Sequence, residues 1–559
     1  MSIPKPNEAI PKRGLPSLVS RQRLYEILPG ALTWATLILP IVLSFFFPKA
    51  VAVFLIIYTS FWFVRTVEFS CAIPFAYWKT VKQMRRDWTA ILTAYSQVAA
   101  DKHPALFEIE APVQGVEPEI MASMKEAIAH HRANGTLKFP EEILHLIVIA
   151  TYKEGVDVLE TTFRRIIASD FPTKQMAVIL AGEERDQENF RHVADYCERE
   201  FSKAFRAFYT TIHPVGTAGE VPGKGSNITY ACKTVVPKVL EETVKDPSNI
   251  VITTLDADNC VDPKYFSILT YHYLTEKDRK KRAYEPLALF YNNLWEVPFI
   301  TRISVLGSGF WNLIESARPY RLRNFASHAQ SLDCLLETDY WSVATIVEDG
   351  HQYWRSYFTF EGDYKVVPLF VPIYQDAVQN RTYWKSIQAL YLQIRRWAWG
   401  CSDTPYVMEN LRRMKDKIPL VTRIVQRYRL MESYYSWATA AVLLSISIPI
   451  PRYTNAEFAQ STIAYNMGII LSSMYTLAWI GIAVTVGMSL FTTPPIPRTK
   501  PLLTRIWIVS TLALQWAFSP IITILFGAVP AIEAQTRLML GKYLDFNVTE
   551  KVRTGRVTS

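Results

Sequence analysis

Two acidic side chains follow a short apolar run near the middle of the chain. The run spans residues 250–255 and ends in Asp256-Ala257-Asp258, and its composition predicts a buried strand. Two carboxylates at a strand end repel one another unless a cation compensates them, and such oxygen ligands suit Mg²⁺ or Mn²⁺ beside a diphosphate. Asp256 and Asp258 are therefore candidate metal ligands. A plain Asp-rich turn that caps the strand is the alternative.

A second acid pair, Glu348-Asp349, follows the strand-like apolar run 343–347. A carboxylate in this position can act as general base on an acceptor hydroxyl. Alternatively the two acids begin a helix, where the helix dipole favours negative charge. Glu348 and Asp349 are candidate catalytic residues.

Two further motifs could contact an anion. Lys224 lies between two glycines where a predicted helix begins, and a helix N-terminus with a nearby lysine suits phosphate. The spacing is not that of a P-loop, so a solvated turn is the alternative. Gln393, Arg396 and Trp397 share one face of the predicted helix 383–399, where the guanidinium could neutralise a diphosphate and the indole could stack on a sugar. The same helix could instead lie on a membrane surface with its aromatic residues at the interface.

Alternating strands and helices must position these motifs. We predict strands at 144–150, 176–181 and 206–211, and helices at 156–168, 187–201 and 226–240. This alternation is typical of a mostly parallel sheet covered on both faces, in which ligands bind beyond the carboxyl ends of the strands. The first strand runs into the polar loop Thr151-Tyr152-Lys153-Glu154, which we regard as a candidate binding loop or an ordinary strand end.

The composition favours a membrane protein. Half of the 559 residues are hydrophobic and the net charge is +9. The apolar residues gather in 31–47 and 50–64 and again in 433–450, 461–491 and 506–532, so the basic flanks indicate a membrane surface and argue against nucleic acid as a partner. Pro520 and Pro530 interrupt the last stretch, and we favour a broken re-entrant pair over one tilted span because a pair keeps the basic C-terminal tail in the cytoplasm. None of the six cysteines forms a CxxC pair, so a zinc site or disulfide framework is not expected.

In their order along the chain, these motifs resemble those of the membrane-embedded family-2 glycosyltransferases, the group of cellulose, chitin and hyaluronan synthases. The resemblance covers roughly residues 144–400. It implies an α/β fold of the GT-A type, a nucleotide-sugar-binding domain with a mostly parallel sheet, flanked by transmembrane helices. It also implies roles for individual residues. Asp256 and Asp258 would bind metal and diphosphate, Asp349 would be the base, and Thr151 and Glu154 would lie near the nucleotide. Lys224 with Asn227 is a further motif of the resemblance, and contacts with diphosphate and acceptor would come from Gln393, Arg396 and Trp397.

Two segments depart from the pattern of this family. The loop that usually carries a base-binding Asp reads 180–186 here, with Glu183 as the substitute. The segment 325–330, Phe-Ala-Ser-His-Ala-Gln, replaces the Gly-Thr-Asn-like acceptor segment. The acceptor pocket is therefore expected to differ from that of the well-known polysaccharide synthases.

Together these observations predict an inverting, metal-dependent glycosyltransferase of the cell membrane with a cytoplasmic catalytic domain. It would use Mg²⁺ or Mn²⁺, a nucleotide-sugar donor and a glycan or lipid-linked acceptor, most simply as a polysaccharide synthase. A transferase that adds one sugar to a polyprenyl phosphate or other lipid is the second hypothesis, and an inactive scaffold or transport subunit is the third. The expected divisions are a basic tail (1–30), a membrane hairpin (31–78), linker helices (79–140), the GT-A domain (141–405), interface helices (406–432), a membrane region (433–540) and a tail (541–559).

Overall fold

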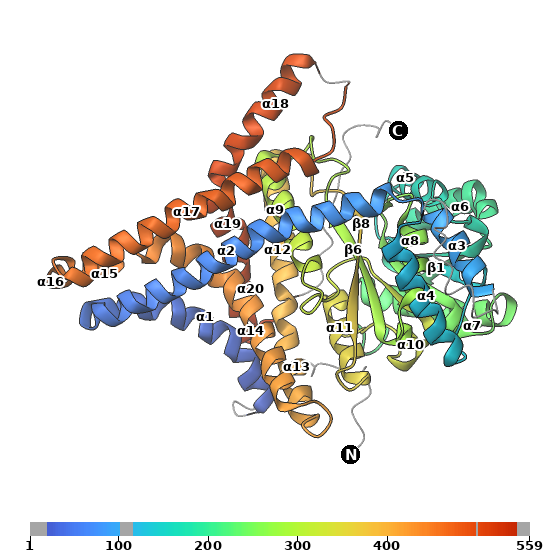
Figure 1. Cartoon of the computed structure of the whole chain (residues 1–559), viewed down its shortest axis with the longest axis horizontal. Helices are drawn as coiled ribbons and strands as arrows, with labels where there is room; N and C mark the ends of the chain where they lie inside the picture. The colour runs from blue at the N-terminus through green and yellow to red at the C-terminus, as the bar shows by residue number, and fades with distance from the viewer. Residues whose placement is uncertain (1–19, 101–115, 499–500, 545–559) are drawn as a thin grey trace. The chain divides into compact units, whose positions relative to one another are not determined.

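The computed structural model describes residues 20–100, 116–498 and 501–544, and the chain divides into two compact units (Figure 1). In the described part, the first unit comprises Trp78–Leu289 and Arg318–Gln375. The second comprises the chain up to Tyr77 together with Phe290–Ala317 and the residues from Asp376 onward. The basic ends on which the predicted orientation depends, within 1–19 and 545–559, lie outside the described residues.

A sheet of eight strands forms the centre of the first unit. The strands are β1 (Leu144–Ala150), β2 (Met176–Glu183), β3 (Ala207–His213), β4 (Ile250–Asp256), β5 (Cys260–Val261), β6 (Arg282–Leu289), β7 (Ala329–Ser331) and β8 (Lys365–Tyr374). Their order is β3-β2-β1-β4-β7-β6-β8-β5. The pairs β1–β2, β2–β3, β1–β4 and β6–β8 are parallel, whereas β7 and β5 pair antiparallel with their neighbours.

The sheet is therefore mixed: the first four strands and the pair β6–β8 are parallel as predicted, and β7 and β5 add antiparallel pairs. The two antiparallel strands contain two and three residues. Runs this short carry no periodic pattern, which explains why the sequence did not predict them.

Alternating residues of β1, β2, β3 and β4 pack into two cores on opposite faces of the sheet. Ile147 and Ile149 of β1 join the core that α5 (Val156–Ile167), α6 (Gln187–Phe201) and α8 (Tyr265–Thr275) cover, together with α3 (Trp88–Ala100) and α4 (Pro118–Ala133). Leu146 and Val148 join the core under α7 (Lys224–Glu242) and α10 (Leu332–Glu337). Because both faces are covered, the parallel strands read as continuous apolar runs.

The segment 343–347 is a loop, so its interpretation as a strand is wrong. Hydroxyl groups compete for its backbone: Ser342 accepts a hydrogen bond from Ala344 N–H at 3.3 Å, and Thr345 accepts one from Val347 N–H at 3.3 Å. Such local bonds favour turns over a sheet ladder. The chain then enters α11 (Glu348–Thr359), so Glu348 and Asp349 lie in the first turn of a helix.

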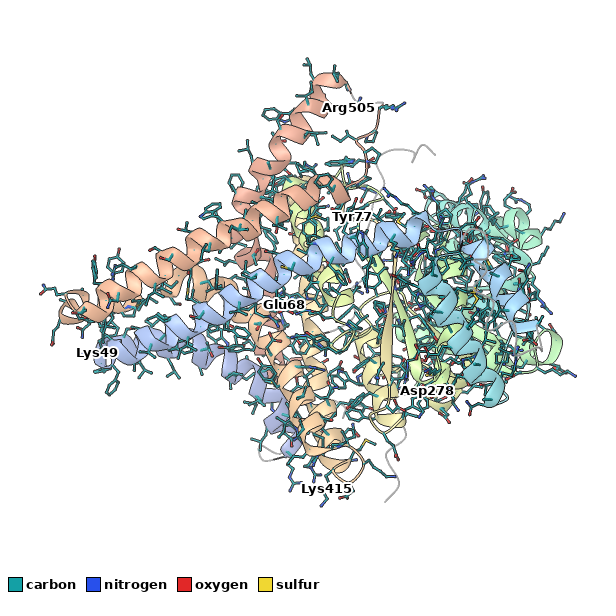
Figure 2. All side chains as sticks on the ribbon, viewed as in Figure 1. Lys49, Glu68, Tyr77, Asp278, Lys415 and Arg505 are labelled. Atoms are coloured by element: carbon teal, nitrogen blue, oxygen red, sulfur yellow. The ribbon has the colours of Figure 1, made fainter. Side chains whose placement is uncertain are left out.

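Among the described residues, four helices are long and apolar enough to cross a membrane: α1 (Arg21–Phe46), α2 (Pro48–Arg85), α17 (Thr462–Thr492) and the segment Leu502–Met539. Lys49 lies in the first turn of α2, just after the end of α1 (Figure 2). The predicted span 433–450 falls in α14 (Leu420–Val442) and the π-helical turn Leu443–Ser447, which are not among the four in the described part of the chain.

The last of these segments, Leu502–Met539, is a continuous helical stretch whose hydrogen-bond pattern changes near the two prolines. It consists of α18 (Leu502–Gln515), a 3₁₀ turn (Trp516–Phe518), α19 (Ser519–Thr523), a π-helical turn (Ile524–Ala528) and α20 (Val529–Met539). A proline cannot donate a backbone hydrogen bond, so the α-helical ladder changes near Pro520 and Pro530. Whether the segment re-enters one side of a membrane stays a prediction.

Candidate functional site

Lys224 connects two of the predicted acids at the carboxyl end of the parallel strands. Its Nζ lies 2.9 Å from Asp256 Oδ1 and 3.6 Å from Asp349 Oδ1. The side chain of Lys224 is 12% exposed, that of Asp349 19% and that of Asp256 45%. Burial lowers the pKa of Lys224, but the charges of Asp256, Asp349 and Glu348 outweigh burial and raise it above the ordinary value, so the ammonium is charged.

A close approach of two backbone segments brings this lysine to the acids. A Cβ on Gly225 would lie 2.6 Å from Ser342 O and 3.0 Å from Glu348 Cβ. Only glycine therefore allows the start of α7 to pack against the segment that leads into α11. Asn227, one turn into α7, donates from Nδ2 to Ala181 O at 2.9 Å and fixes the same helix to β2.

Asp258 is buried two residues beyond the half-exposed Asp256, at the end of β4. Asn259 donates from Nδ2 to Asp258 Oδ1 at 3.1 Å and from its backbone N–H to Asp256 O at 3.0 Å. Ser327 in turn donates a short hydrogen bond to Asn259 Oδ1. Neighbouring side chains therefore hold the Asp-Ala-Asp turn, and its role as a metal site stays a prediction.

His328 is a buried neighbour of Asp349 that the sequence did not single out. Its Nδ1 lies 2.9 Å from Ala326 O and 3.7 Å from Asp349 Oδ1, and Trp341 Nε1 donates to its Nε2 at 3.2 Å. Because indole can only donate, Nε2 is the acceptor and Nδ1 carries the proton. Burial lowers the pKa of His328, which favours this neutral imidazole.

The Thr151–Glu154 loop folds around the carboxylate of Glu154. Glu154 Oε2 accepts hydrogen bonds from Thr151 Oγ1 at 3.0 Å and from Tyr152 N–H at 2.6 Å. Lys153 has a left-handed backbone with φ 71°, and its N–H donates to Asp186 Oδ2 at 2.7 Å. Burial, followed by the charge of Asp258, raises the pKa of Glu154 to about 7.

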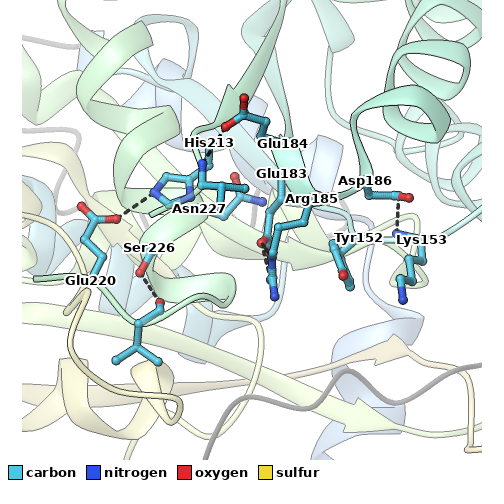
Figure 3. Close-up of polar contacts among 12 residues, drawn as sticks. Tyr152, Lys153, Glu183, Glu184, Arg185, Asp186, His213, Glu220, Ser226 and Asn227 are labelled. Atoms are coloured by element: carbon cyan, nitrogen blue, oxygen red, sulfur yellow. Dashed lines mark hydrogen bonds and ion pairs between the residues drawn. The ribbon is translucent and has the colours of Figure 1, made fainter. Parts of the chain in front are cut away.

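Glu183 closes the end of β2 next to this loop (Figure 3). Arg185 donates from Nε to Glu183 Oε2 at 2.8 Å and makes a second, shorter bond from Nη2. The guanidinium of Arg185 also lies 4.5 Å from the centre of the Tyr152 ring. A ring, a guanidinium and a carboxylate therefore lie together where Glu183 was expected to replace the usual Asp.

A pocket with an empty volume of about 340 Å³, open solvent included, adjoins Glu183 and Arg185. Its far side is the loop after β3, where His213 Nε2 lies 2.7 Å from Glu220 Oε2 and Glu184 accepts a hydrogen bond from Val215 N–H at 2.7 Å (Figure 3). This pair was not among the candidate residues that the sequence indicated. Three glycines on a helix-free stretch between His213 and Lys224 were the available signal.

The residues present fit an ion that arrives with a diphosphate. Among the described residues, no group of three or more His, Cys, Asp or Glu side chains is arranged to hold a metal. Asp256 and Asp258 supply two carboxylates on one turn, and Mg²⁺ sites commonly combine one or two carboxylates with substrate phosphates. The chemistry of the donor set therefore suits an ion whose remaining ligands come from substrate and water.

Gln393, Arg396 and Trp397 belong to the second unit, on α12 (Tyr383–Ala398). Gln393 is buried, and Trp397 packs against Phe290 at 5.7 Å between ring centres. Glu533 of α20 accepts hydrogen bonds from Tyr391 at 2.6 Å and Arg395 at 2.7 Å, which joins α12 to α20.

Only some of the aromatic residues that suggested a helix on a membrane surface are exposed. Trp384 is 76% exposed, whereas Trp399 is buried. The structure confirms the predicted helix, and contact of its residues with a diphosphate or an acceptor stays a prediction.

No family model matches the chain, and no curated protein matches it. The chain is similar to solved structures of glycosyltransferases. One is a mannosyltransferase from Pyrobaculum calidifontis in complex with GDP-Man and Mn²⁺, with 12% identity, a TM-score of 0.36 and coverage of 78% of this chain and 99% of that one. Another is S. aureus TarS in complex with UDP-GlcNAc, with 9% identity, a TM-score of 0.32 and coverage of 72% and 94%. Likenesses this distant carry no argument about the activity of this chain, which must be inferred from its own residues.

Proposed function

We propose that the chain is an inverting glycosyltransferase of the GT-A type that moves a sugar from a nucleotide-diphosphate donor to a hydroxyl of a glycan acceptor. The observation that carries this proposal is Lys224, whose side chain is 12% exposed and lies between Asp256 and Asp349 at the carboxyl ends of the parallel strands. A cation and two separate acids supply what the transfer needs: a counter-charge for a leaving diphosphate and a base for the attacking hydroxyl.

In the proposed reaction Asp349 accepts the proton of the acceptor hydroxyl. The hydroxyl oxygen then attacks the anomeric carbon on the face opposite the nucleotide, and the bond from that carbon to the diphosphate oxygen breaks. The bonding electrons leave with the nucleotide diphosphate, whose negative charge Lys224 offsets. Glu348, buried next to Asp349, adds to the negative field that keeps Lys224 charged.

A Mg²⁺ or Mn²⁺ ion held by Asp256 and Asp258 would offset further charge on the leaving diphosphate. Asn259 holds Asp258 at 3.1 Å, so the buried carboxylate is oriented before any ion binds. On the nucleotide side, we assign Thr151, Glu154 and Glu183 to the nucleoside. The ring of Tyr152 and the guanidinium of Arg185 lie next to these groups and suit a planar base.

We further propose that the enzyme is a membrane polysaccharide synthase with its catalytic unit in the cytoplasm. Four helices are long and apolar enough to span a membrane, which supports membrane association. The Gln393, Arg396 and Trp397 motif, through its family resemblance, supports an acceptor that remains bound between additions.

The test is a panel of nucleotide sugars with purified protein and Mn²⁺ or Mg²⁺. We expect one donor to be consumed and its sugar to appear in a product, with the anomeric configuration inverted. A product many sugars long supports the synthase, whereas a single sugar on a lipid supports the lipid transferase. Donor binding without hydrolysis or transfer would reject the enzyme and favour a scaffold.

A further inference from the structure

The segment Asn324–His328 joins the two acidic arms of the site, although its sequence was noteworthy only as a departure from the family pattern. Ser327 donates to Asn259, which holds Asp258. The next residue, His328, has its Nδ1 3.7 Å from Asp349 Oδ1. The backbone of His328 is fixed to β4, because Thr254 N–H donates to His328 O at 3.1 Å. Displacement of this segment would therefore move groups that hold both acids.

Glu285 is the anchor of this segment. It lies on β6, 2% exposed, at a register shift in the pairing of β6 with β8. Its Oε1 accepts a hydrogen bond from Phe325 N–H at 3.1 Å, and its Oε2 accepts one from Asn324 Nδ2 at 3.1 Å. In the described part of the chain no basic side chain pairs with it.

A carboxyl group in such a place is costly for folding alone. Burial raises the pKa of Glu285 well above its ordinary value, the charge of Asp349 raises it further, and the hydrogen bond from Phe325 only partly offsets both. An apolar or amide residue would fill a buried strand position at lower cost. Its two hydrogen bonds to consecutive residues of one segment explain why an acid occupies this position.

We propose that Glu285 is a positioning residue, which through the segment Asn324–His328 holds Asp258 and Asp349 at the separation that the transfer reaction requires. This inference rests on the proposed function and deepens it, since it concerns the same site. Glu285 touches neither donor nor acceptor in this proposal. Its effect reaches the acids through Ser327 and Asn259 on one side and through His328 on the other.

The experiment compares Glu285→Gln, which keeps the shape and one acceptor oxygen, with Glu285→Ala, which removes both. Glu276→Gln is the matched control, because Glu276 also belongs to the first unit and pairs with Arg282 of the same strand β6 at 3.0 Å. Hydrogen exchange of the full-length protein reports on the segment, and binding of UDP and of GDP in the presence of Mn²⁺ reports on the donor site.

We expect faster exchange confined to residues 324–328 and the start of α11 in both Glu285 variants. In Glu285→Gln, kcat should fall by roughly tenfold, because one hydrogen bond that holds the segment is lost and the acids are positioned less well, while the donor KM stays within about threefold. Glu285→Ala should lower kcat further than Glu285→Gln does, because the glutamine amide keeps one acceptor oxygen. Glu276→Gln should change neither the hydrogen exchange nor kcat.

Several outcomes overturn the proposal. Glu285→Gln with wild-type kcat would show that Glu285 does not position the acids. If Glu285→Gln lowered donor binding, kcat and the melting temperature together, Glu285 would have a structural role only. If the wild-type protein transfers no sugar from any donor, the positioning role fails together with the proposed function. If hydrogen exchange is unchanged in both variants while the wild-type protein transfers sugar, Glu285 does not anchor the segment and the proposed function still stands.

Discussion

Replacing Lys224 with methionine tests the proposed site most directly. Methionine keeps much of the aliphatic stem and removes the charge that lies 2.9 Å from Asp256 Oδ1 and 3.6 Å from Asp349 Oδ1. Two consequences follow. The nucleotide diphosphate loses a cationic partner, and the two acids lose the cation that compensates their negative charge.

The size of each effect follows from the geometry. A hydrogen bond to a charged group contributes about 1.5–3 kcal/mol, so nucleotide diphosphate should bind about 10- to 150-fold more weakly. Leaving buried charges without their partner costs about 3–5 kcal/mol. Because the Asp256 side chain is 45% exposed, we expect a loss of folding stability nearer to about 2 kcal/mol.

The two acids left behind should then bind a divalent cation in place of the lysine. We expect Mn²⁺ without nucleotide to raise the melting temperature of Lys224→Met more than that of the wild type. Equilibrium dialysis with UDP and GDP measures the nucleotide, and a thermal melt with and without Mn²⁺ measures the metal. Lys233→Met is the matched control, because Lys233 lies on the same helix and pairs with Asp339 at 2.8 Å on the exposed surface.

A Lys224→Met protein that binds nucleotide diphosphate as tightly as the Lys233→Met control would refute the assignment of this lysine to the diphosphate. An equal effect of Mn²⁺ on both melts would show that Lys224 does not occupy a cation position between the acids. Lys224→Arg separates charge from shape. It retains the positive charge, so compared with Lys224→Met it should restore more of the folding stability than of the donor affinity.

Four further predictions concern the other acids and the orientation. Asp349→Asn should cut turnover by roughly 10²–10⁴ with donor binding nearly intact, and a parallel loss of binding would make it a donor-binding residue. Asp258→Asn should abolish transfer and weaken donor binding as a chelator does in the wild type, and full activity in metal-free buffer would contradict this. The Glu154 carboxyl has a pKa raised to about 7 from 4.5, so the folded state binds its proton more tightly and folding stability should fall as pH rises through this window. Glu154→Gln should remove this dependence of the melting temperature on pH. An unchanged dependence would show that another group causes it. A tag at the exposed turn Asn134-Gly135 should be reachable only from the cytoplasm, and labelling from outside intact cells would reverse the topology.

Local patterns predicted the parts of the site that lie on long regular elements. The strand before Asp256 ends where the apolar run ends, and α7 begins at Lys224 next to its glycines. These features depend on nearest neighbours in the sequence, so a strand period or a helix start is enough to locate them. The contact between Lys224 and Asp349 could not be predicted in this way, because the two residues lie 125 positions apart in the sequence and the contact depends on a close approach at Gly225.

The residues that the sequence analysis missed share one physical property. Glu285, His328 and the His213–Glu220 pair bind other protein groups, so their function depends on packing that no periodic pattern records. Glu285 nevertheless left a signal, since it is an acid inside the apolar run of β6. A charge in a buried strand has to find partners, and those partners identify the segment whose position it sets.

The arrangement around Lys224 also explains how acids with different proposed tasks can lie together before any donor binds. Carboxylates at one end of a sheet repel one another unless a cation compensates them. One lysine, 2.9 Å from Asp256 Oδ1 and 3.6 Å from Asp349 Oδ1, supplies that positive charge. A diphosphate that draws this lysine away would leave Asp256 to the metal and Asp349 to the acceptor proton, so that the donor itself completes the site. This sequence of events requires a flexible cation, and lysine, with its long stem and single charge, meets that need better than the rigid guanidinium of arginine.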